Sequence, residues 1–375
     1  MVSISELGIL ADDLTGACDA AAAFAPRAGA VRVHVGVPGP GAGRPGTGLA
    51  VINMQSRLLG PARSRRRAAR AARLIRGARV VYVKTDSVLR GPVGAELEGI
   101  SSVFPGRRVY LVPAVPEMGK TTVGGRLFER GVPAHLTDYA RDPASPLLTN
   151  DARQIIQSTG RVQLEIVDAE TSGDIERAVS HALSDGSAIL AGSVGLADAL
   201  ARCMEGTERA CGVEDRAGRL MIVCGSGYPS AREQLQRAAS AFGSGIVTLG
   251  KEAGMKEMLR MCGSSRAAFL QIETGPLGAW GELSALFRKV GRVITAFRPG
   301  SLGIVGGETA FRILRRLGTT QLTVVGRELP GVACGIIRDG ALAGSAFATK
   351  GGSVGDPDAC VRMVEWLQRS GGSRR

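Results

Sequence analysis

Short apolar runs alternate with longer helical patterns through the first half of the chain. The runs that predict buried strands are Leu7–Leu10, Val31–Val35, Leu49–Ile52, Val80–Val83, Val109–Val112, Gln163–Val167 and Ala188–Ala191. The helical patterns between them cover Thr15–Ala25, Ala62–Ile75, Gly94–Ser102 and Ile175–Leu183. This alternation predicts a mostly parallel sheet covered by helices. The Gly- and Pro-rich residues 36–48 are expected to form an exposed loop.

A second series of apolar runs begins after a polar, charged stretch, Met204–Arg219. Its runs are Leu220–Val223, Gly245–Leu249, Ala267–Gln271, Leu302–Val305, Leu322–Val325 and Cys334–Ile337. A chain of 375 residues is also longer than a single core usually grows. We therefore predict an α/β protein of two domains, residues 1–210 and 219–369. Each would be a mostly parallel, helix-covered sheet, with the active site in the cleft between them and a disordered tail after residue 369.

Composition narrows the class of protein. No run approaches the roughly 18 apolar residues that a transmembrane helix needs, and no signal peptide is evident, so neither a membrane span nor secretion is expected. The seven cysteines are scattered without a Cys-x-x-Cys pair, and only three histidines are present, which argues against a zinc site. An odd number of cysteines without a regular spacing is typical of proteins in a reducing cytoplasm, which is the location we predict.

The net charge of +13 raises the question of nucleic-acid binding. The densest basic stretch, Arg63–Arg79, has alanines interleaved at helical spacing, which predicts the solvated face of an amphipathic helix. Aromatic residues make up only 4% of the chain, so rings on which bases could stack are scarce. We therefore expect no nucleic-acid partner, and instead a small anionic substrate drawn by the positive charge.

Two adjacent acids, Asp12 and Asp13, follow the first apolar run and precede a helix of small residues. Ligands of open α/β sheets bind at the carboxyl ends of strands, where these acids would stand. One of them could instead cap the helix, but a cap accounts for a single Asp. We therefore predict a functional role for at least one of the pair.

Lysine is rare, with 6 residues against 41 arginines, and Lys84, Lys120 and Lys350 occur in turns rich in Gly, Ser or Thr. An ammonium beside backbone N–H groups suits phosphate or carboxylate, although each could be an ordinary surface lysine. Gly119-Lys120-Thr121 is not a P-loop, because Ala114 replaces the first glycine that the motif requires. It is expected to be a loop that grips the anionic end of a substrate.

Glycine-rich turns gather in the second half. The turn at Gly225 and Ser226 lacks the third glycine of a dinucleotide fingerprint, which argues against a nicotinamide enzyme. Backbone N–H groups at such turns bind phosphate well, so we predict a nucleotide site. Its candidate residues are Gly225, Ser226, Gly306, Gly307, Glu308, Thr309, Lys350, Gly351, Gly352 and Gly355. Glu308 fits only through a metal ion or a ribose hydroxyl. Phosphoryl transfer assisted by Mg²⁺ would follow, with metal ligands that the sequence does not identify.

Several long motifs in a fixed order resemble the four-carbon acid sugar kinase family over nearly the whole chain. In the first half they are Ala11–Ala17 with Asp19, Ser56-Arg57, Lys84–Gly91 with Glu96, and Pro113–Thr122. In the second half they are Gly225-Ser226 with Gln234, Gly306–Ala310, Pro330-Gly331, and Lys350–Gly352 with Gly355.

The resemblance implies an N-terminal sugar-acid domain and a C-terminal nucleotide domain that phosphorylate the terminal hydroxyl of erythronate, threonate or 3-oxo-tetronate with ATP. We predict that the catalytic base is Asp12 or Asp86, with Asp12 preferred because it ends the first strand. The implied substrate-binding residues are Asp13, Ser56, Arg57, Lys84, Ser87, Arg90, Lys120 and Thr121.

Departures from the family pattern keep other functions open. Lys120 replaces an arginine, and Tyr228 and Ala231 replace a Ser and a Thr. These changes affect the expected substrate more than the expected reaction. The alternatives are a kinase for a hydroxy or amino acid resembling 4-hydroxythreonine, and a non-catalytic relative that binds nucleotide or ligand. The sequence leaves the oligomeric state open, a homodimer included.

Overall fold

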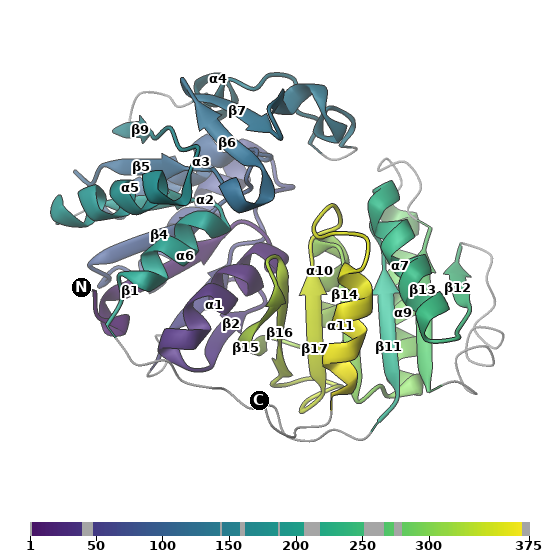
Figure 1. The fold of residues 1–375 in the computed structure, drawn as a ribbon. Coiled ribbons are helices and arrows are strands. Elements are labelled where there is room, and N and C mark those ends of the chain that lie inside the picture. Colours follow the sequence, from purple (N-terminus) through teal and green to yellow (C-terminus); the bar gives the residue numbers. More distant parts are fainter. Residues whose placement is uncertain are drawn as a thin grey trace. The chain divides into compact units, whose positions relative to one another are not determined.

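The computed structural model divides into two compact units, Met1–Arg209 and Ala210–Arg375 (Figure 1). It describes residues 2–39, 48–142, 145–157, 162–186, 188–205, 218–250, 266–273 and 280–369. Most of the predicted loop over 36–48, most of the polar stretch 204–219 and the predicted disordered tail lie outside the described residues.

The first unit is built on a parallel sheet with the strand order β2-β3-β1-β4-β10-β5-β9. Its strands are β1 (Leu7–Ala11), β2 (Val31–His34), β3 (Ala50–Asn53), β4 (Val80–Lys84), β5 (Val109–Val112), β9 (Leu164–Ile166) and β10 (Ile189–Gly192). Every apolar run predicted in this half forms one of these strands. The central strands β1 and β4 are buried along their whole length, as expected for a sheet covered on both faces.

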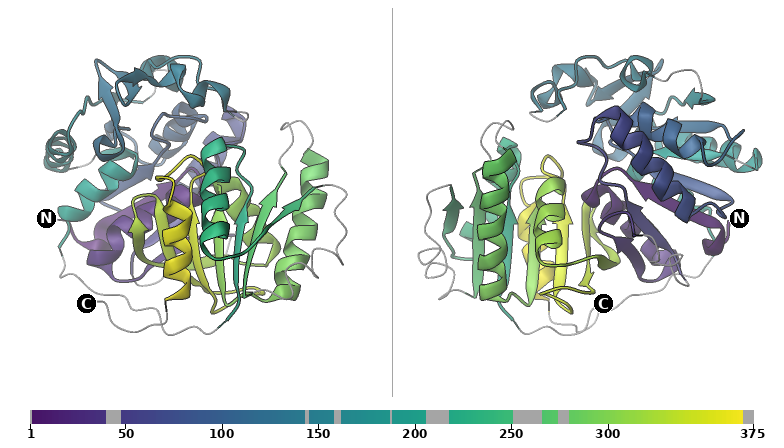
Figure 2. Two further views of the ribbon diagram at one scale, coloured as in Figure 1. Left: turned by 45° about the vertical axis from the view of Figure 1, so that its right-hand side comes forward. Right: turned by 180° about the vertical axis from the view of Figure 1, so that it is seen from behind.

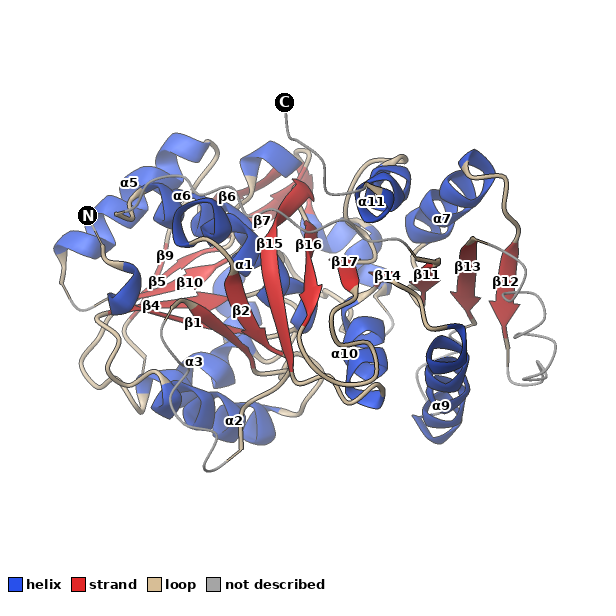
Figure 3. Cartoon of the chain, turned by 90° about the horizontal axis from the view of Figure 1, so that it is seen from below, coloured by secondary structure: helices blue, strands red, loops and turns tan. Residues whose placement is uncertain are grey.

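Helices cover both faces of this sheet (Figure 3). They are α1 (Leu14–Ala28), α2 (Pro61–Leu74), α3 (Val93–Ser101), α5 (Ser172–Ser184) and α6 (Val194–Arg202), and the short helix α4 (Ala152–Ile156) packs against α3. Helices α2 and α3 pack together on one face, and α1, α5 and α6 cover the other. Four of the five alanines of α2 are buried while its arginines are exposed, which confirms the predicted amphipathic helix.

A small antiparallel sheet in this unit was not predicted. It consists of β6 (Lys120–Val123), β7 (Arg126–Glu129) and β8 (Val132–Pro133), followed by the short helical turns η3 (Ala134–Leu136) and η4 (Asp138–Arg141). Gly124 and Gly125 form the β6–β7 turn, and both backbone N–H groups donate to Asp168, at 2.7 and 2.8 Å. Lys120 and Thr121 therefore lie on a strand, and their prediction as a loop was wrong.

The second unit has a mixed sheet with the order β12-β13-β11-β14-β17-β16-β15. The first five strands run parallel to one another. Strand β16 is antiparallel to β17, and β15 is antiparallel to β16. The strands are β11 (Leu220–Cys224), β12 (Ile246–Leu249), β13 (Ala267–Ile272), β14 (Ser301–Val305), β15 (Gln321–Leu329), β16 (Val332–Ile337) and β17 (Ala346–Lys350). All six predicted runs form strands, whereas β17 was missed.

Helices α7 (Pro229–Ala241) and α11 (Ala359–Gln368) cover one face of the second sheet (Figure 2). Helices α9 (Trp280–Phe297) and α10 (Gly307–Arg316) cover the other face (Figure 3). The predicted fold class, α/β with mostly parallel, helix-covered sheets, is thus confirmed for both units. No helix in the described ranges combines the length and the apolar character that crossing a membrane requires.

Candidate active site

The carboxyl ends of neighbouring strands in the first unit stand level with one another. Ala11 at the end of β1 pairs with Asn53 of β3 on one side and with Lys84 of β4 on the other. Lys84 in turn pairs with Gly192 of β10. Because the strands are parallel, the loops that follow them leave the same edge of the sheet, where α/β proteins bind ligands. The pairing therefore gathers site residues that are far apart in the sequence.

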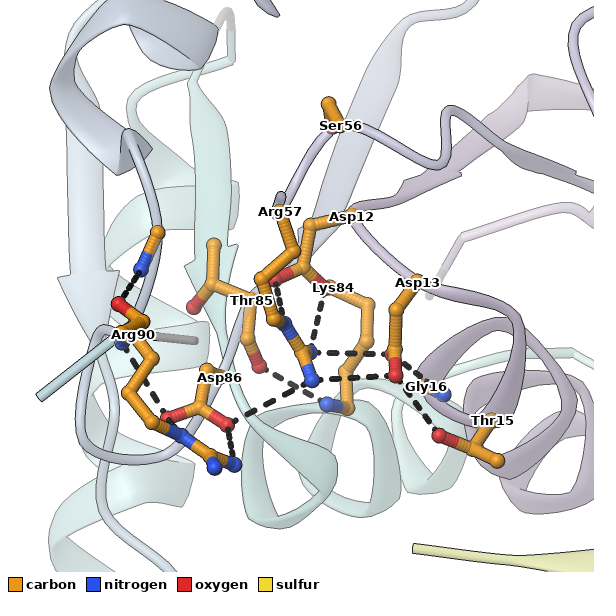
Figure 4. Close-up of polar contacts among 12 residues, drawn as sticks. Asp12, Asp13, Thr15, Gly16, Ser56, Arg57, Lys84, Thr85, Asp86 and Arg90 are labelled. Atoms are coloured by element: carbon orange, nitrogen blue, oxygen red, sulfur yellow. Dashed lines mark hydrogen bonds and ion pairs between the residues drawn. The ribbon is translucent and has the colours of Figure 1, made fainter. Parts of the chain in front are cut away.

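One guanidinium holds both acids that follow β1 (Figure 4). Arg57 donates from Nε and Nη2 to the two carboxylate oxygens of Asp12 at 2.8 and 2.9 Å. It donates from Nη1 and Nη2 to Asp13 at 3.0 Å each. Asp12 is 0% exposed and Asp13 6%. These are charge-assisted hydrogen bonds of the forked type, so Arg57 is occupied by carboxylates of the protein itself.

Asp13 also caps helix α1. Its Oδ1 accepts the backbone N–H of Gly16 at 2.8 Å, and its Oδ2 accepts the hydroxyl of Thr15 at 2.8 Å. This satisfies one of the free N–H groups at the start of the helix. The capping role considered for the acid pair therefore accounts for Asp13 and leaves Asp12 to be explained.

The surroundings move the pKa values of the two acids in opposite directions. Burial raises the pKa of Asp12 above its ordinary value even against the charge of Arg57, and Asp13 adds to the rise. Burial would raise the pKa of Asp13 as well, but Arg57, Lys84 and the two capping hydrogen bonds bring it below its ordinary value. Adjacent acids whose pKa values diverge are suited to different roles, one taking a proton and one remaining charged.

The loop after β4 closes tightly on Asp86. Asp86 Oδ1 accepts the backbone N–H of Val88 at 3.0 Å, and Leu89 adopts a φ of 61°, which residues with a Cβ seldom do. Arg90 turns back on this loop, with Nη2 2.6 Å from Asp86 Oδ2 and Nη1 2.6 Å from Asp142 Oδ2. Two carboxylates thus fix the direction of the Arg90 side chain, that of Asp86 within the loop and that of Asp142 outside it.

The same contacts make Asp86 a weak base. Its burial favours a raised pKa, but the charges of Arg90 and Arg57 overcome that effect and hold the pKa well below the ordinary range. Arg57 Nη1 lies 3.8 Å from Asp86 Oδ2. Asp86 is therefore a fixed negative charge between two arginines.

Gly91 lets the Arg57 loop approach the Arg90 loop. It has a φ of 96°, and a Cβ at this position would lie 2.9 Å from the backbone carbonyl oxygen of Arg57. A side chain there would force the two loops apart. Ser56 lies at the same crossing, and its backbone N–H donates to the Asp12 carbonyl at 2.9 Å. The Ser56 hydroxyl is buried and finds no hydrogen-bond partner among the described residues.

Two lysines at this edge are not paired with a carboxylate. Lys84 Nζ donates to the Thr85 carbonyl at 2.8 Å, and Lys120 Nζ to Ser87 Oγ at 2.9 Å. Within the described ranges, neither ammonium lies within 4.0 Å of a carboxylate oxygen. Both are more than nine-tenths buried, so they are not ordinary surface lysines. Of the cations predicted to grip the substrate, the two lysines are the ones left available for an external anion. Thr121 forms no side-chain hydrogen bond within the described part.

Glu96 of α3 belongs to this neighbourhood, although sequence reasoning gave it no role. It is 1% exposed, and neither carboxylate oxygen has a hydrogen-bond partner among the residues described. Burial and the charge of Asp12 raise its pKa to about 8, with the charge of Arg57 acting in the opposite direction. The only signal in the sequence was its place in the motif that follows Lys84.

The second unit has a level edge of its own. Cys224 at the end of β11 pairs with Val305 of β14, which pairs with Lys350 of β17. The three glycine-rich turns that were predicted to bind a nucleotide therefore start side by side. The backbone joins them, since the Gly225 N–H donates to Val305 and the Gly306 N–H to Lys350, at 3.2 and 2.9 Å.

These turns approach too closely for side chains. A Cβ on Gly352 would lie 2.1 Å from Ser226 Oγ, and one on Gly225 would lie 2.4 Å from Thr309 Oγ1. Gly306 is the N-cap of α10, which starts at Gly307. The free N–H groups of a helix start beside bare backbone form the kind of surface that binds phosphate.

The surroundings of Lys350 differ from those predicted. It ends strand β17 rather than lying in a turn, and it is 0% exposed. Its Nζ donates to the carbonyls of Gly351 and Gly352 at 2.9 and 3.4 Å, and burial lowers its pKa. Lys350 therefore stabilises the glycine turn by hydrogen bonds to its carbonyl groups. Glu308 Oε1 accepts Nε of Arg312 at 2.7 Å, one helical turn away.

Gln234 fixes the last of the three turns. From helix α7, its side-chain amide donates to the carbonyls of Val354, Gly355 and Asp356 at 3.3, 3.0 and 2.9 Å. Gln234 is 1% exposed, so these bonds are shielded from water. The position of Gly355 thus depends on a residue that sequence reasoning noted without assigning it a role.

Among the described residues, no group of three or more His, Cys, Asp or Glu side chains is arranged to hold a metal ion. At the edge of the first unit, arginines engage Asp12, Asp13 and Asp86 instead.

Comparisons with known proteins match the N-terminal and C-terminal parts of the chain to two different domain models. A model of a sugar-binding N-terminal domain matches residues 7–231, and a model of a nucleotide-binding C-terminal domain matches residues 263–360. A D-threonate kinase of Bordetella bronchiseptica is 26% identical, covering 96% of this chain and 97% of its own. A D-erythronate kinase of Heliobacterium modesticaldum is 25% identical, covering 97% of each. A 3-oxo-tetronate kinase of Methylobacterium radiotolerans is 30% identical over 44% of this chain and 40% of its own.

Solved structures share the fold. A protein from Salmonella typhimurium LT2 superposes with a TM-score of 0.76 at 19% identity, covering 96% of this chain and 98% of its own. A Haemophilus influenzae protein superposes with a TM-score of 0.69 at 18% identity, covering 96% of this chain and all of its own.

Proposed function

Because this chain belongs to the four-carbon acid sugar kinase family, we propose that it transfers the γ-phosphoryl group of ATP to the terminal hydroxyl of a four-carbon sugar acid such as threonate, erythronate or 3-oxo-tetronate. The sugar acid would bind at the carboxyl edge of the first unit, and ATP at that of the second. The observation that carries this proposal is geometric: buried Asp12, held by Arg57, follows the end of β1 beside the end of β4, where Lys84 donates to a neutral oxygen. The pKa of Asp12, raised while those of Asp13 and Asp86 are lowered, agrees with this assignment.

Asp12 is the proposed proton acceptor. As the substrate oxygen forms its bond to the γ-phosphorus, its proton passes to Asp12, while the bond between that phosphorus and the β,γ-bridging oxygen breaks and ADP leaves. A raised pKa makes Asp12 a better base than an ordinary carboxylate. Asp13, which caps α1, and Asp86, which holds Arg90, would remain charged throughout.

The two lysines are the proposed anion-binding groups. Lys84 and Lys120 each donate to a neutral oxygen, so their charges are available to the substrate carboxylate or to the phosphoryl group in transfer. Arg57 and Arg90 would act indirectly, by holding Asp12 and the Asp86 loop in place. This divides the four cations predicted to grip the substrate into two that bind it and two that position acids.

ATP is proposed to lie along the glycine turns at Gly225, Gly306 and Gly352, with its phosphates toward the start of α10. The absence of side chains at these positions supports a close backbone approach. Lys350 would support the turn rather than contact phosphate. The described side chains do not form a metal site, so we derive no step through a resident metal. Mg²⁺ would enter with the nucleotide, ligated mainly by phosphate oxygens and water.

The test is an ATP-consumption screen of the purified protein against D- and L-threonate, erythronate, 3-oxo-tetronate, five-carbon sugar acids and hydroxy amino acids, with and without Mg²⁺. We expect turnover of at least one four-carbon acid, with a phosphorylated product identified by mass spectrometry. Turnover of a hydroxy amino acid alone would replace the substrate class proposed here. No turnover of any acid would overturn the proposal.

A further inference from the structure

One aromatic ring faces two of the four cations of the first unit. Tyr139, in η4, is 4% exposed. The Arg90 Cζ atom lies 5.1 Å from its ring centroid and the Lys120 Nζ atom 5.3 Å. Both distances fall within the roughly 6 Å at which a ring attracts a cation.

The contribution of the ring differs between the two cations, because their other contacts differ. Arg90 is already fixed by the carboxylates of Asp86 and Asp142. Within the described ranges, Lys120 Nζ is contacted by the hydroxyl of Ser87 and by the ring, and the charge of Asp86 acts on it only from beyond 4.0 Å. Without Tyr139, the buried ammonium would keep a single neutral hydrogen bond, which does not fix a flexible four-carbon side chain.

A ring also differs from a carboxylate as a partner. Its negative face attracts an ammonium but carries no net charge, so it holds Lys120 without neutralising it. A carboxylate in the same place would form an ion pair and leave no charge for a ligand. The arrangement therefore fixes the position of Lys120 Nζ without pairing it directly with a carboxylate.

We propose that Tyr139 is a positioning residue that selects an anionic substrate by holding the side-chain nitrogen of Lys120 in place. The inference rests on the proposed function and deepens it, because it assigns the carboxylate end of the sugar acid to Lys120. Tyr139 itself would not touch the substrate.

The test compares Tyr139→Leu and Tyr139→Phe on the acid that the wild-type protein phosphorylates best, and on the matching uncharged sugar alcohol. For Tyr139→Leu we expect KM for the acid to rise about 3- to 30-fold, the range of a buried cation–ring attraction. KM for ATP, kcat, and KM for the alcohol should change less than twofold. Tyr139→Phe, which keeps the ring, should restore KM for the acid.

The chain offers a matched control in Phe104. It is also 4% exposed, and its ring also faces a cation, with Arg107 Cζ 4.6 Å from the centroid. Phe104→Leu therefore removes a buried ring of the same kind without affecting Lys120. We expect its KM for the acid to stay at the wild-type value.

If Tyr139→Leu does not fold, phenylalanines with one to three fluorine atoms at position 139 test the same point. Fluorine withdraws charge from the ring face and hardly alters its shape, so KM for the acid should rise with each fluorine. Equal losses for acid and alcohol, no trend with fluorination, or an equal loss in Phe104→Leu would overturn the inference alone. A wild-type protein without turnover of any sugar acid would overturn the proposed function and the inference with it.

Discussion

In each of the two units, the carboxyl ends of parallel strands are aligned in a row. The residues that follow these strand ends differ in kind between the two units. At the edge of the first unit, Asp12 and Asp13 share Arg57, and Asp86 holds Arg90. At the edge of the second unit, bare backbone gathers around Gly225, Gly306 and Gly352. Charged side chains thus dominate the first edge, and backbone without side chains dominates the second.

This difference predicts which amino-acid substitutions each edge should tolerate. Where charged groups are balanced against one another, a substitution that keeps size and removes charge should do the most damage. Where backbone must approach a ligand, adding a single methyl group should do more than removing a side chain. Each prediction below tests one side of this contrast, in order of decreasing effect.

Asp12→Asn is expected to have the largest effect. It keeps the shape of Asp12 but removes the proposed proton acceptor, so kcat should fall about 10²- to 10⁴-fold, while ATP still binds. Steady-state kinetics on the preferred acid and calorimetry with ATP measure the two quantities. Asp185→Asn, at an exposed position that follows α5, is the matched control. Near-normal turnover in Asp12→Asn would remove Asp12 as the base.

Lys120→Gln should act on substrate binding. Loss of the charge-assisted hydrogen bond to a carboxylate costs about 1.5–3 kcal/mol, so KM for the acid should rise roughly 10- to 100-fold with KM for ATP unchanged. Lys289→Gln, on α9 of the other unit, serves as the control. If KM for ATP rises instead, the division of labour between the two edges is wrong.

Gly352→Ala tests the other side of the contrast. The new Cβ would lie 2.1 Å from Ser226 Oγ, so the turn must move, and we expect ATP to bind about tenfold more weakly while the acid binds as before. Gly245→Ala is matched, because nothing lies within 4 Å of a Cβ there. Unchanged affinity for ATP, measured by calorimetry, would exclude this turn from the nucleotide site.

Glu96→Gln should have the smallest effect, seen in stability. In the folded protein the pKa of Glu96 is raised to about 8, by burial first, so its proton stays on well above the roughly 4.3 at which the unfolded chain loses it. The folded state then binds more protons between these values, and the free energy of unfolding contributed by Glu96 falls as pH rises through that window.

Glutamine has no proton to lose. The free energy of unfolding of Glu96→Gln should therefore increase relative to wild type from pH 5 to pH 8, by about 1–3 kcal/mol in total. Urea unfolding at several pH values measures it, with Glu170→Gln as an exposed control. A difference that does not vary with pH would mean that Glu96 is charged in the folded state.

The sequence predicted the large sheets well, because buried parallel strands form continuous apolar runs that need no knowledge of their neighbours. It missed β6 and β17, whose residues, Lys120–Val123 and Ala346–Lys350, mix polar and small side chains. Lys120 and Lys350 were identified as significant, but their burial depends on tertiary contacts that the sequence does not display.

The candidate site shows the same limit. Asp12 was identifiable because it follows a strand, which is a local feature. The roles of Glu96 and Tyr139 depend on groups brought near them by distant parts of the chain, so no local pattern could reveal them. An active site in the cleft between the domains, a homodimer and a cytoplasmic location stay predictions.

The level row of strand ends also bears on how the protein reaches its native state. Every proposed site loop of the first unit after β1, β3 and β4 is positioned by the pairing of Ala11 with Asn53 and Lys84. A slip of one residue between these strands would turn their side chains to the opposite face. Because such pairings join remote segments, they form slowly. The recovery of activity after dilution from denaturant would therefore report on the alignment of these strands. A compact species with misaligned strands should be inactive.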